Sequence, residues 1–159
     1  MWTLIFMGAS LYWYVVPYES DVNSALQKLR EREFHDGRYN PVVPFPQFPV
    51  GPASESPGTP HKSMGEAIDA SGADGTRSIL DIVAGVSSDP GFSPDPDVMV
   101  HPLTDAQLVE LFGTTIPEAA TIVRNYKFLD KISRGSGVYI VMKEGGWPRE
   151  ILFAGYSFD

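Results

Sequence analysis

The chain has 159 residues, a length that suits one domain with a substantial core. It contains no cysteine, which excludes a disulfide framework, a thiolate metal site and a cysteine nucleophile. Twelve basic and 20 acidic residues give a net charge of −8, so binding of nucleic acid through a basic face is not expected. We therefore interpret residues 1–159 as a single globular domain.

The negative charge is concentrated in the middle third of the sequence. Between Ser63 and Val123, Arg77 is the only lysine or arginine, and Asp74 and Asp81 are its candidate partners. An acidic surface of this kind speeds association with a basic partner, although acidity can also serve solubility alone. The acidic residues of the segment are Glu66, Asp69, Asp74, Asp81, Asp89, Asp95, Asp97, Asp105, Glu110 and Glu118.

The first 18 residues carry no charge, and this run is near the lower length limit of a membrane helix. No basic residue precedes it, and residues 11–16 are mostly aromatic or β-branched, so we predict a buried strand and no membrane or export segment. Both alternating faces are apolar, which favours a central strand covered on both sides. Residues 1–6 are interpreted as either part of the fold or an N-terminal extension. The lack of an export signal predicts a cytoplasmic location.

Helix start and stop signals are frequent along the chain. Ser20 or Asp21 begins one predicted helix, which ends near Phe34 before Gly37. Ser63 with Glu66, Thr104 with Gln107, and Thr115 with Glu118 match the capping-box pattern. These boxes predict helices over 64–70, over 104–112, and from 115 to about 134.

The remaining apolar segments predict strands. Residues 76–83 are interpreted as a strand and residues 84–102 as a loop, and the last residues form a hairpin around Gly145 and Gly146. The predicted fold is α+β. It has a small, mostly antiparallel sheet of about four strands (near 11–16, 76–83, 138–143 and 150–156), covered by about four helices.

Residues 35–62 contain seven of the 14 prolines, which nearly excludes regular structure. The first half of this segment is strongly apolar. We predict a long, ordered, proline-rich loop within the domain, which lies across it with Phe45 and Phe48 as anchors.

No motif for a metal or a cofactor is present, and none is predicted. His35, His61 and His101 lack the spacing of a helical metal site, and no phosphate-binding fingerprint occurs. The segment from Glu33 to Asn40 combines an acid, a base, a guanidinium and a phenol. Glu33, His35, Arg38 and Tyr39 are thus candidates for acid–base chemistry or anion binding. The alternative interpretation is that Arg38 and Asn40 bond the backbone and Tyr39 packs on the core.

Three hypotheses remain open. The first is a non-catalytic acidic binding protein, inhibitor-like or immunity-like, that presents a negative face to a basic protein partner. Its candidate partner-binding residues are Asp89, Asp95, Asp97, Asp105 and Glu110. The second is a small enzyme or anion binder with its pocket beside residues 33–40 and the proline-rich loop. The third is a subunit of a homo-oligomer, because exposed aromatic residues can form a symmetric interface. We choose the first.

Overall fold

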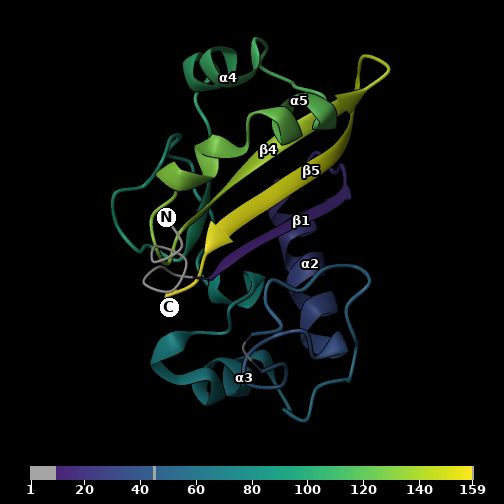
Figure 1. Cartoon of the computed structure of the whole chain (residues 1–159), viewed down its shortest axis with the longest axis vertical. Helices are drawn as coiled ribbons and strands as arrows, with labels where there is room; N and C mark the ends of the chain where they lie inside the picture. The colour runs from purple at the N-terminus through teal and green to yellow at the C-terminus, as the bar shows by residue number, and fades with distance from the viewer. Residues whose placement is uncertain (1–9, 45, 159) are drawn as a thin grey trace.

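A twisted five-stranded sheet crosses the middle of the molecule (Figure 1). The computed structural model describes residues 10–44 and 46–158. The strand order is β1-β5-β4-β3-β2, with antiparallel pairs β1–β5 and β5–β4 and parallel pairs β4–β3 and β3–β2. The strands are β1 (Leu11–Pro17), β2 (Gly85–Val86), β3 (Met99–Pro102), β4 (Gly137–Glu144) and β5 (Trp147–Tyr156).

Helices cover both faces of this sheet, and their ends follow from local hydrogen bonds. Asp21 caps α2 through Ser24 N, and Gly37 ends it at φ +71°. Thr104 and Gln107 form both halves of a capping box on α4. The α-helices are α2 (Val22–Asp36), α3 (Met64–Ser71), α4 (Asp105–Phe112) and α5 (Ala119–Arg124), and the 3-10 helices are η1 (Gly72–Asp74), η2 (Ile79–Asp81) and η3 (Tyr126–Lys131).

Two apolar cores lie on opposite faces of the sheet. On β5, Ile151 and Phe153 enter the core under α2, whereas Leu152 and Ala154 enter the core under α5 and η3. Since successive side chains of a strand point to opposite faces, β5 is buried on both sides. The helices of the first half of the chain therefore cover one face, and those of the second half cover the other (Figure 1). The result is a mixed α+β single domain.

The strand predicted over 76–83 is wrong, and the loop predicted over 84–102 contains β2 and β3 instead. Thr76 N donates to Asp81 Oδ1 at 2.8 Å, and Leu80 N donates to Ser78 Oγ at 3.2 Å. Arg77 has a left-handed backbone at φ +54°. These local bonds give the backbone partners inside its own turn, so this segment forms η2 and adds no strand. Because β2 and β3 pair in parallel, the sheet is also less antiparallel than predicted.

The long helix predicted from 115 to 134 is two short helices, α5 and η3. Glu118 begins α5 without a side-chain cap, so the predicted third capping box is absent. Asn125 separates the two helices at φ −122°, and its side chain donates to Leu111 O at 3.1 Å. An amide that bonds a neighbouring backbone competes with continuation of the helix.

The prediction that β1 is central and covered on both sides is also wrong. β1 lies at the margin of the sheet and pairs with β5 (Figure 1). Tyr12, Tyr14 and Val16 are buried, but Trp13 is 51% exposed and Val15 is 40% exposed. The hairpin of β4 and β5, the helix before Gly37 and the helices that follow Ser63 and Thr104 are confirmed. The prediction for residues 1–6 and the anchor Phe45 lie outside the described residues.

Candidate functional site

The predicted partner-binding acids lie on two neighbouring segments. Asp89 and Asp95 are exposed in the loop between β2 and β3, and Asp105 and Glu110 are exposed on α4. Gly91 N in the loop donates to Pro102 O at 2.7 Å, which ties the loop to the strand that leads into α4. In the described part of the chain these four carboxylates have no hydrogen bond or ion pair, so their charge is open to solvent.

Asp97, the fifth predicted acid, has an internal partner. His101 is 6% exposed, its Nε2 lies 2.5 Å from Asp97 Oδ2, and its Nδ1 lies 2.7 Å from Asp89 O. Because a carbonyl oxygen only accepts, Nδ1 carries a hydrogen. Burial raises the pKa of Asp97, but hydrogen bonds from His101 and Met99 N outweigh it and leave this pKa lowered. The His101 side chain thus fixes the acidic loop from within.

A basic side chain borders the acidic loop. Lys131 Nζ lies 5.8 Å from the centre of the Phe92 ring, a cation–π contact. Ser133 Oγ donates to Ser93 O at 2.5 Å, so the end of η3 and the loop are in direct contact. A positive charge therefore lies beside the acidic loop.

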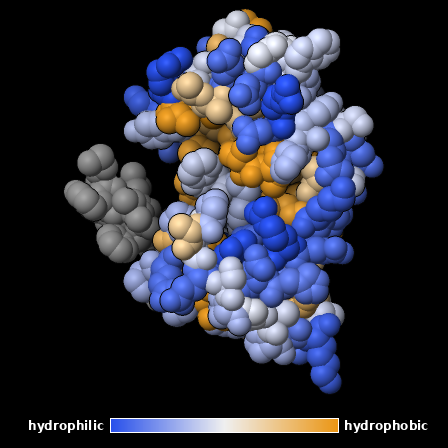
Figure 2. Space-filling model, turned by 90° about the vertical axis from the view of Figure 1, so that its right-hand side faces the viewer, coloured by the Kyte–Doolittle hydropathy of each residue, from blue (hydrophilic) through white to orange (hydrophobic). Residues whose placement is uncertain are grey.

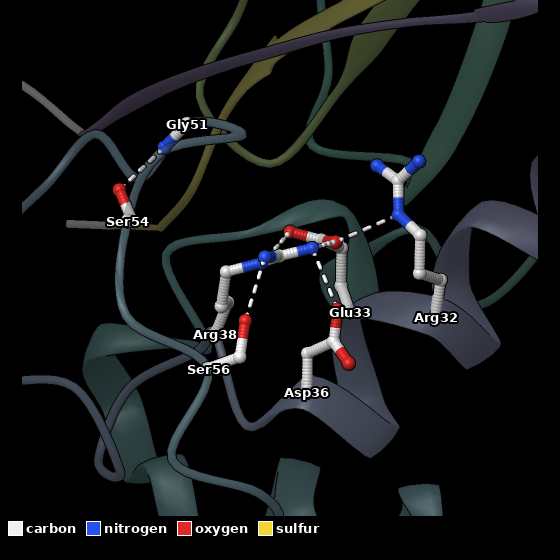
Figure 3. Close-up of polar contacts among 7 residues, drawn as sticks. All are labelled: Arg32, Glu33, Asp36, Arg38, Gly51, Ser54 and Ser56. Atoms are coloured by element: carbon white, nitrogen blue, oxygen red, sulfur yellow. Dashed lines mark hydrogen bonds and ion pairs between the residues drawn. The ribbon is translucent and has the colours of Figure 1, made fainter.

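The predicted cluster at 33–40 is brought together in part (Figure 3). Arg38 donates from Nε to Glu33 Oε1 at 3.1 Å and from Nη2 to Glu33 Oε2 at 2.7 Å. The same Nη2 lies 2.7 Å from Asp36 Oδ2, and Nη1 donates to Ser56 Oγ at 2.9 Å. Arg32 Nε donates to Glu33 Oε2 at 3.0 Å. The bond to Glu33 raises the pKa of Arg38, so the guanidinium keeps its positive charge.

Tyr39 and His35 do not join this ion-pair cluster. Tyr39 is fully buried, and its hydroxyl lies 2.5 Å from Thr59 Oγ1 and 2.6 Å from His61 Nδ1. His35 is exposed, and its ring contacts Phe34. Asn40 Nδ2 donates to Gly75 O at 2.9 Å. The side chains of Arg38, Tyr39 and Asn40 therefore bond mainly to neighbouring parts of the fold, namely residues 56–61 and Gly75.

Sequence reasoning did not predict a buried polar cluster around Asp81. This carboxylate is 3% exposed, and its Oδ1 accepts from Thr76 N and Thr76 Oγ1, both at 2.8 Å. Burial raises the pKa of Asp81, and the bonds from Thr76 oppose that rise. Arg77, its expected partner, has Nη2 3.6 Å from Asp74 Oδ2. The sequence signal was Asp81 itself, an acid in a run of aliphatic residues.

An apolar groove of about 360 Å³ is the second feature that sequence reasoning missed. It runs between the outer face of β1 and β5 and the helices α5 and η3. Its rim includes exposed Trp13, Val15, Val123 and Tyr126. Figure 2 views the molecule from the right-hand side of Figure 1 and shows hydrophobic residues gathered in the upper half of this face. Its lining has almost no polar surface, so it fits apolar groups and offers little for catalysis.

Comparisons with known proteins add no relative to this geometry. No protein-family model, no curated protein and no solved structure matches the chain. Within residues 10–44 and 46–158, no three histidine or acidic side chains group closely enough to hold a metal ion. No helix in the same ranges has the length and apolar content needed to span a membrane.

Proposed function

We propose that the protein is a non-catalytic, acidic binding protein, inhibitor-like or immunity-like, that presents a negatively charged face to a basic protein partner. The face consists of Asp89, Asp95, Asp97, Asp105 and Glu110. The observation that carries the proposal is that Asp89, Asp95, Asp105 and Glu110 are exposed on two neighbouring segments, which the bond from Gly91 N to Pro102 O ties together. Among the residues that the structure describes, four of these five acids have carboxylates without a bonded partner, and such groups steer an oppositely charged protein.

The internal anchor of the loop also supports a binding role. A loop fixed by His101 presents Asp89 and Asp95 in one arrangement, so less conformational entropy is lost when a partner binds. Asp97 then acts as a positioning residue, since its carboxylate is already bonded to His101.

Charge reversal at the unpaired acids tests the proposal. The variant Asp89→Lys, Asp95→Lys, Glu110→Lys should slow association with the captured basic partner by about ten-fold or more and flatten its salt dependence. The matched control reverses Glu31, Glu55 and Asp69, which are exposed outside this face. Affinity capture at low and high salt with mass spectrometry identifies the partner, and stopped-flow mixing gives the association rate. Equal effects of the two variants, or capture of no basic protein at low salt, would refute the proposal.

The alternative function, a small enzyme or anion binder beside residues 33–40, has weaker support. The guanidinium of Arg38 is already bonded to Glu33, Asp36 and Ser56. The same bonds support our proposal that the proline-rich segment 35–62 is an ordered loop held against the domain. A thermal-shift titration with inorganic phosphate distinguishes the two functions: stabilisation that is lost in Arg38→Ala would favour the anion binder.

A further inference from the structure

The free edge of β1 has features of an interaction surface. β1 is the last strand on its side of the sheet, contains no charged residue, and pairs with β5 in continuous register without a bulge. Natural proteins usually protect such an edge with charges, bulges or a covering element. In β1 the only such feature is Pro17 at its end.

The hydrogen bonds at both ends of β1 reveal which backbone groups face outward. Tyr18 N donates to Arg149 O, and Ser157 N donates to Ser10 O, so the even-numbered residues point toward β5. Because the direction of N–H and C=O alternates along an antiparallel strand, those of Leu11, Trp13 and Val15 point away from β5. No residue in the described ranges bonds these outward groups.

The side chains of the same residues extend the apolar groove to the edge. Trp13 is 51% exposed and Val15 is 40% exposed on the face that carries the groove, and Val123 and Tyr126 are 65% and 63% exposed across it. These four side chains expose on the order of 400 Å² per copy, given the areas typical of aromatic residues. This apolar surface adjoins an unpaired strand edge, and the two features fit a second strand with apolar side chains.

We propose that the occupant is β1 of a second copy of this chain, paired antiparallel about a two-fold axis at Tyr14. In this register Trp13 faces Val15 of the other copy, and Val15 faces Trp13 of the other copy. All these residues direct both backbone groups outward, so each pair exchanges two hydrogen bonds. Leu11 N donates to the Pro17 carbonyl of the other copy, which needs no N–H from Pro17. The two sheets join into one, with both grooves on the same face.

A second copy is favoured over another apolar segment because β1 is complementary to itself. The register matches a large side chain with a small one on the groove face, and an uncharged strand brings no like charges together. A contact covering most of the exposed side chains and the strand edges buries roughly 1,000 Å² in total, at the low end for specific interfaces. The dimer should therefore be weak and concentration-dependent.

Net charge gives this dimer a salt dependence opposite to that of the proposed basic partner. Each copy carries −8, so two copies repel each other and added salt should strengthen their association. Association with a basic partner should weaken with salt. Failure of one proposal is thus distinguishable from failure of the other.

Sedimentation equilibrium of the full chain across a concentration and salt series tests the inference. We expect a dimer that strengthens with salt, and we expect Val15→Lys to weaken it at least ten-fold because a charge enters the apolar row. The matched control is Val83→Lys, which changes a 51% exposed valine elsewhere. A monomer at every concentration and salt, or equal effects of the two substitutions, would overturn the inference.

Cysteine cross-linking tests the register, because the chain has no cysteine of its own. A mixture of Trp13→Cys and Val15→Cys proteins should form a mixed disulfide faster than either protein forms a disulfide with itself. Amide exchange at Trp13 and Val15 should slow as protein concentration rises. Protection that does not depend on concentration would mean that another part of the same chain covers the edge, and would overturn the inference, as would equal rates of the three disulfides.

Discussion

Replacement of Arg38 by methionine tests whether the Glu33–Arg38 pair holds the end of α2 to the proline-rich loop. Glu33 is 2% exposed and Arg38 is 7% exposed, so both charges are buried. Methionine keeps much of the side-chain volume and removes the three donors that bond Glu33 and Ser56. The substitution leaves Glu33 buried with Arg32 as its remaining charged partner.

The expected loss follows from the desolvation of Glu33. Removing one partner of a buried ion pair costs about 3–5 kcal/mol, and the remaining bond from Arg32 offsets part of this loss. We expect the free energy of unfolding to fall by about 3 kcal/mol. For a chain of this size, that change lowers the melting temperature by roughly 6–12 °C.

Urea denaturation followed by tryptophan fluorescence measures the effect, and amide exchange around Ser56 reports whether the loop is released. The matched control is Arg32→Met, because the Arg32 side chain is 47% exposed and its bond to Glu33 is partly solvated. This control should cost less than about 1 kcal/mol. If Arg38→Met costs no more than Arg32→Met, or if exchange near Ser56 stays unchanged, the pair does not hold the loop.

Three further substitutions give independent checks. Burial raises the pKa of Asp81, so the stability that this group contributes is greatest below its unfolded pKa. That contribution is lost as the pH rises through the folded pKa. Asp81→Asn should remove this decline, as measured by urea unfolding across pH. An added methyl at Gly155 would lie 2.5 Å from Tyr12 Oη, so Gly155→Ala should cost about 2 kcal/mol, and Tyr12→Phe in the same chain should recover part of it in thermal unfolding. Thr104→Ala removes a capping box and should lower the free energy of unfolding by about 1 kcal/mol in the same assay. An unchanged free energy would mean that water replaces the hydrogen bond of the cap.

Three of the four predicted helix starts were correct because their signals are local, whereas the signal at Thr115 was wrong. Asp21 with Gly37 and Thr104 with Gln107 act within a few residues of each other, and the structure has the expected bonds. The hairpin was predictable for the same reason, since Gly145 and Gly146 both take positive φ at its turn.

The sheet order depends on contacts between distant segments, and sequence patterns report these poorly. β2 has two residues and β3 has four, so neither has a recognisable period. Residues 76–83 have strand-like composition, yet the side chains of Asp81 and Ser78 accept hydrogen bonds from the backbone N–H groups of Thr76 and Leu80. The apolar pattern of β1 showed two hydrophobic faces but could not show that one of them stays uncovered.

The candidate site was predictable as a set of residue types and less so as a geometry. Residues 33–40 were predicted as a group of polar side chains, but the ion pair of Glu33 with Arg38 was not predicted, since the alternative interpretation had Arg38 bonding the backbone. The hydrogen bond between Asp97 and His101 was missed because residues 84–102 were predicted as a loop, whereas His101 belongs to β3 and is buried. The groove is formed by segments more than 100 residues apart in the sequence, such as Trp13 and Val123, and no local pattern encodes it.

The pairing of β1 with β5 has a consequence for biosynthesis. Leu11 is the register partner of Tyr156, so β1 cannot complete its pairing with β5 until residue 156 has been synthesised. During translation α2 has no completed sheet to cover until β5, which enters both cores, has been synthesised. The sheet therefore cannot form before β5 has left the ribosome, and a nascent chain stalled before residue 147 leaves an uncharged strand without its neighbour.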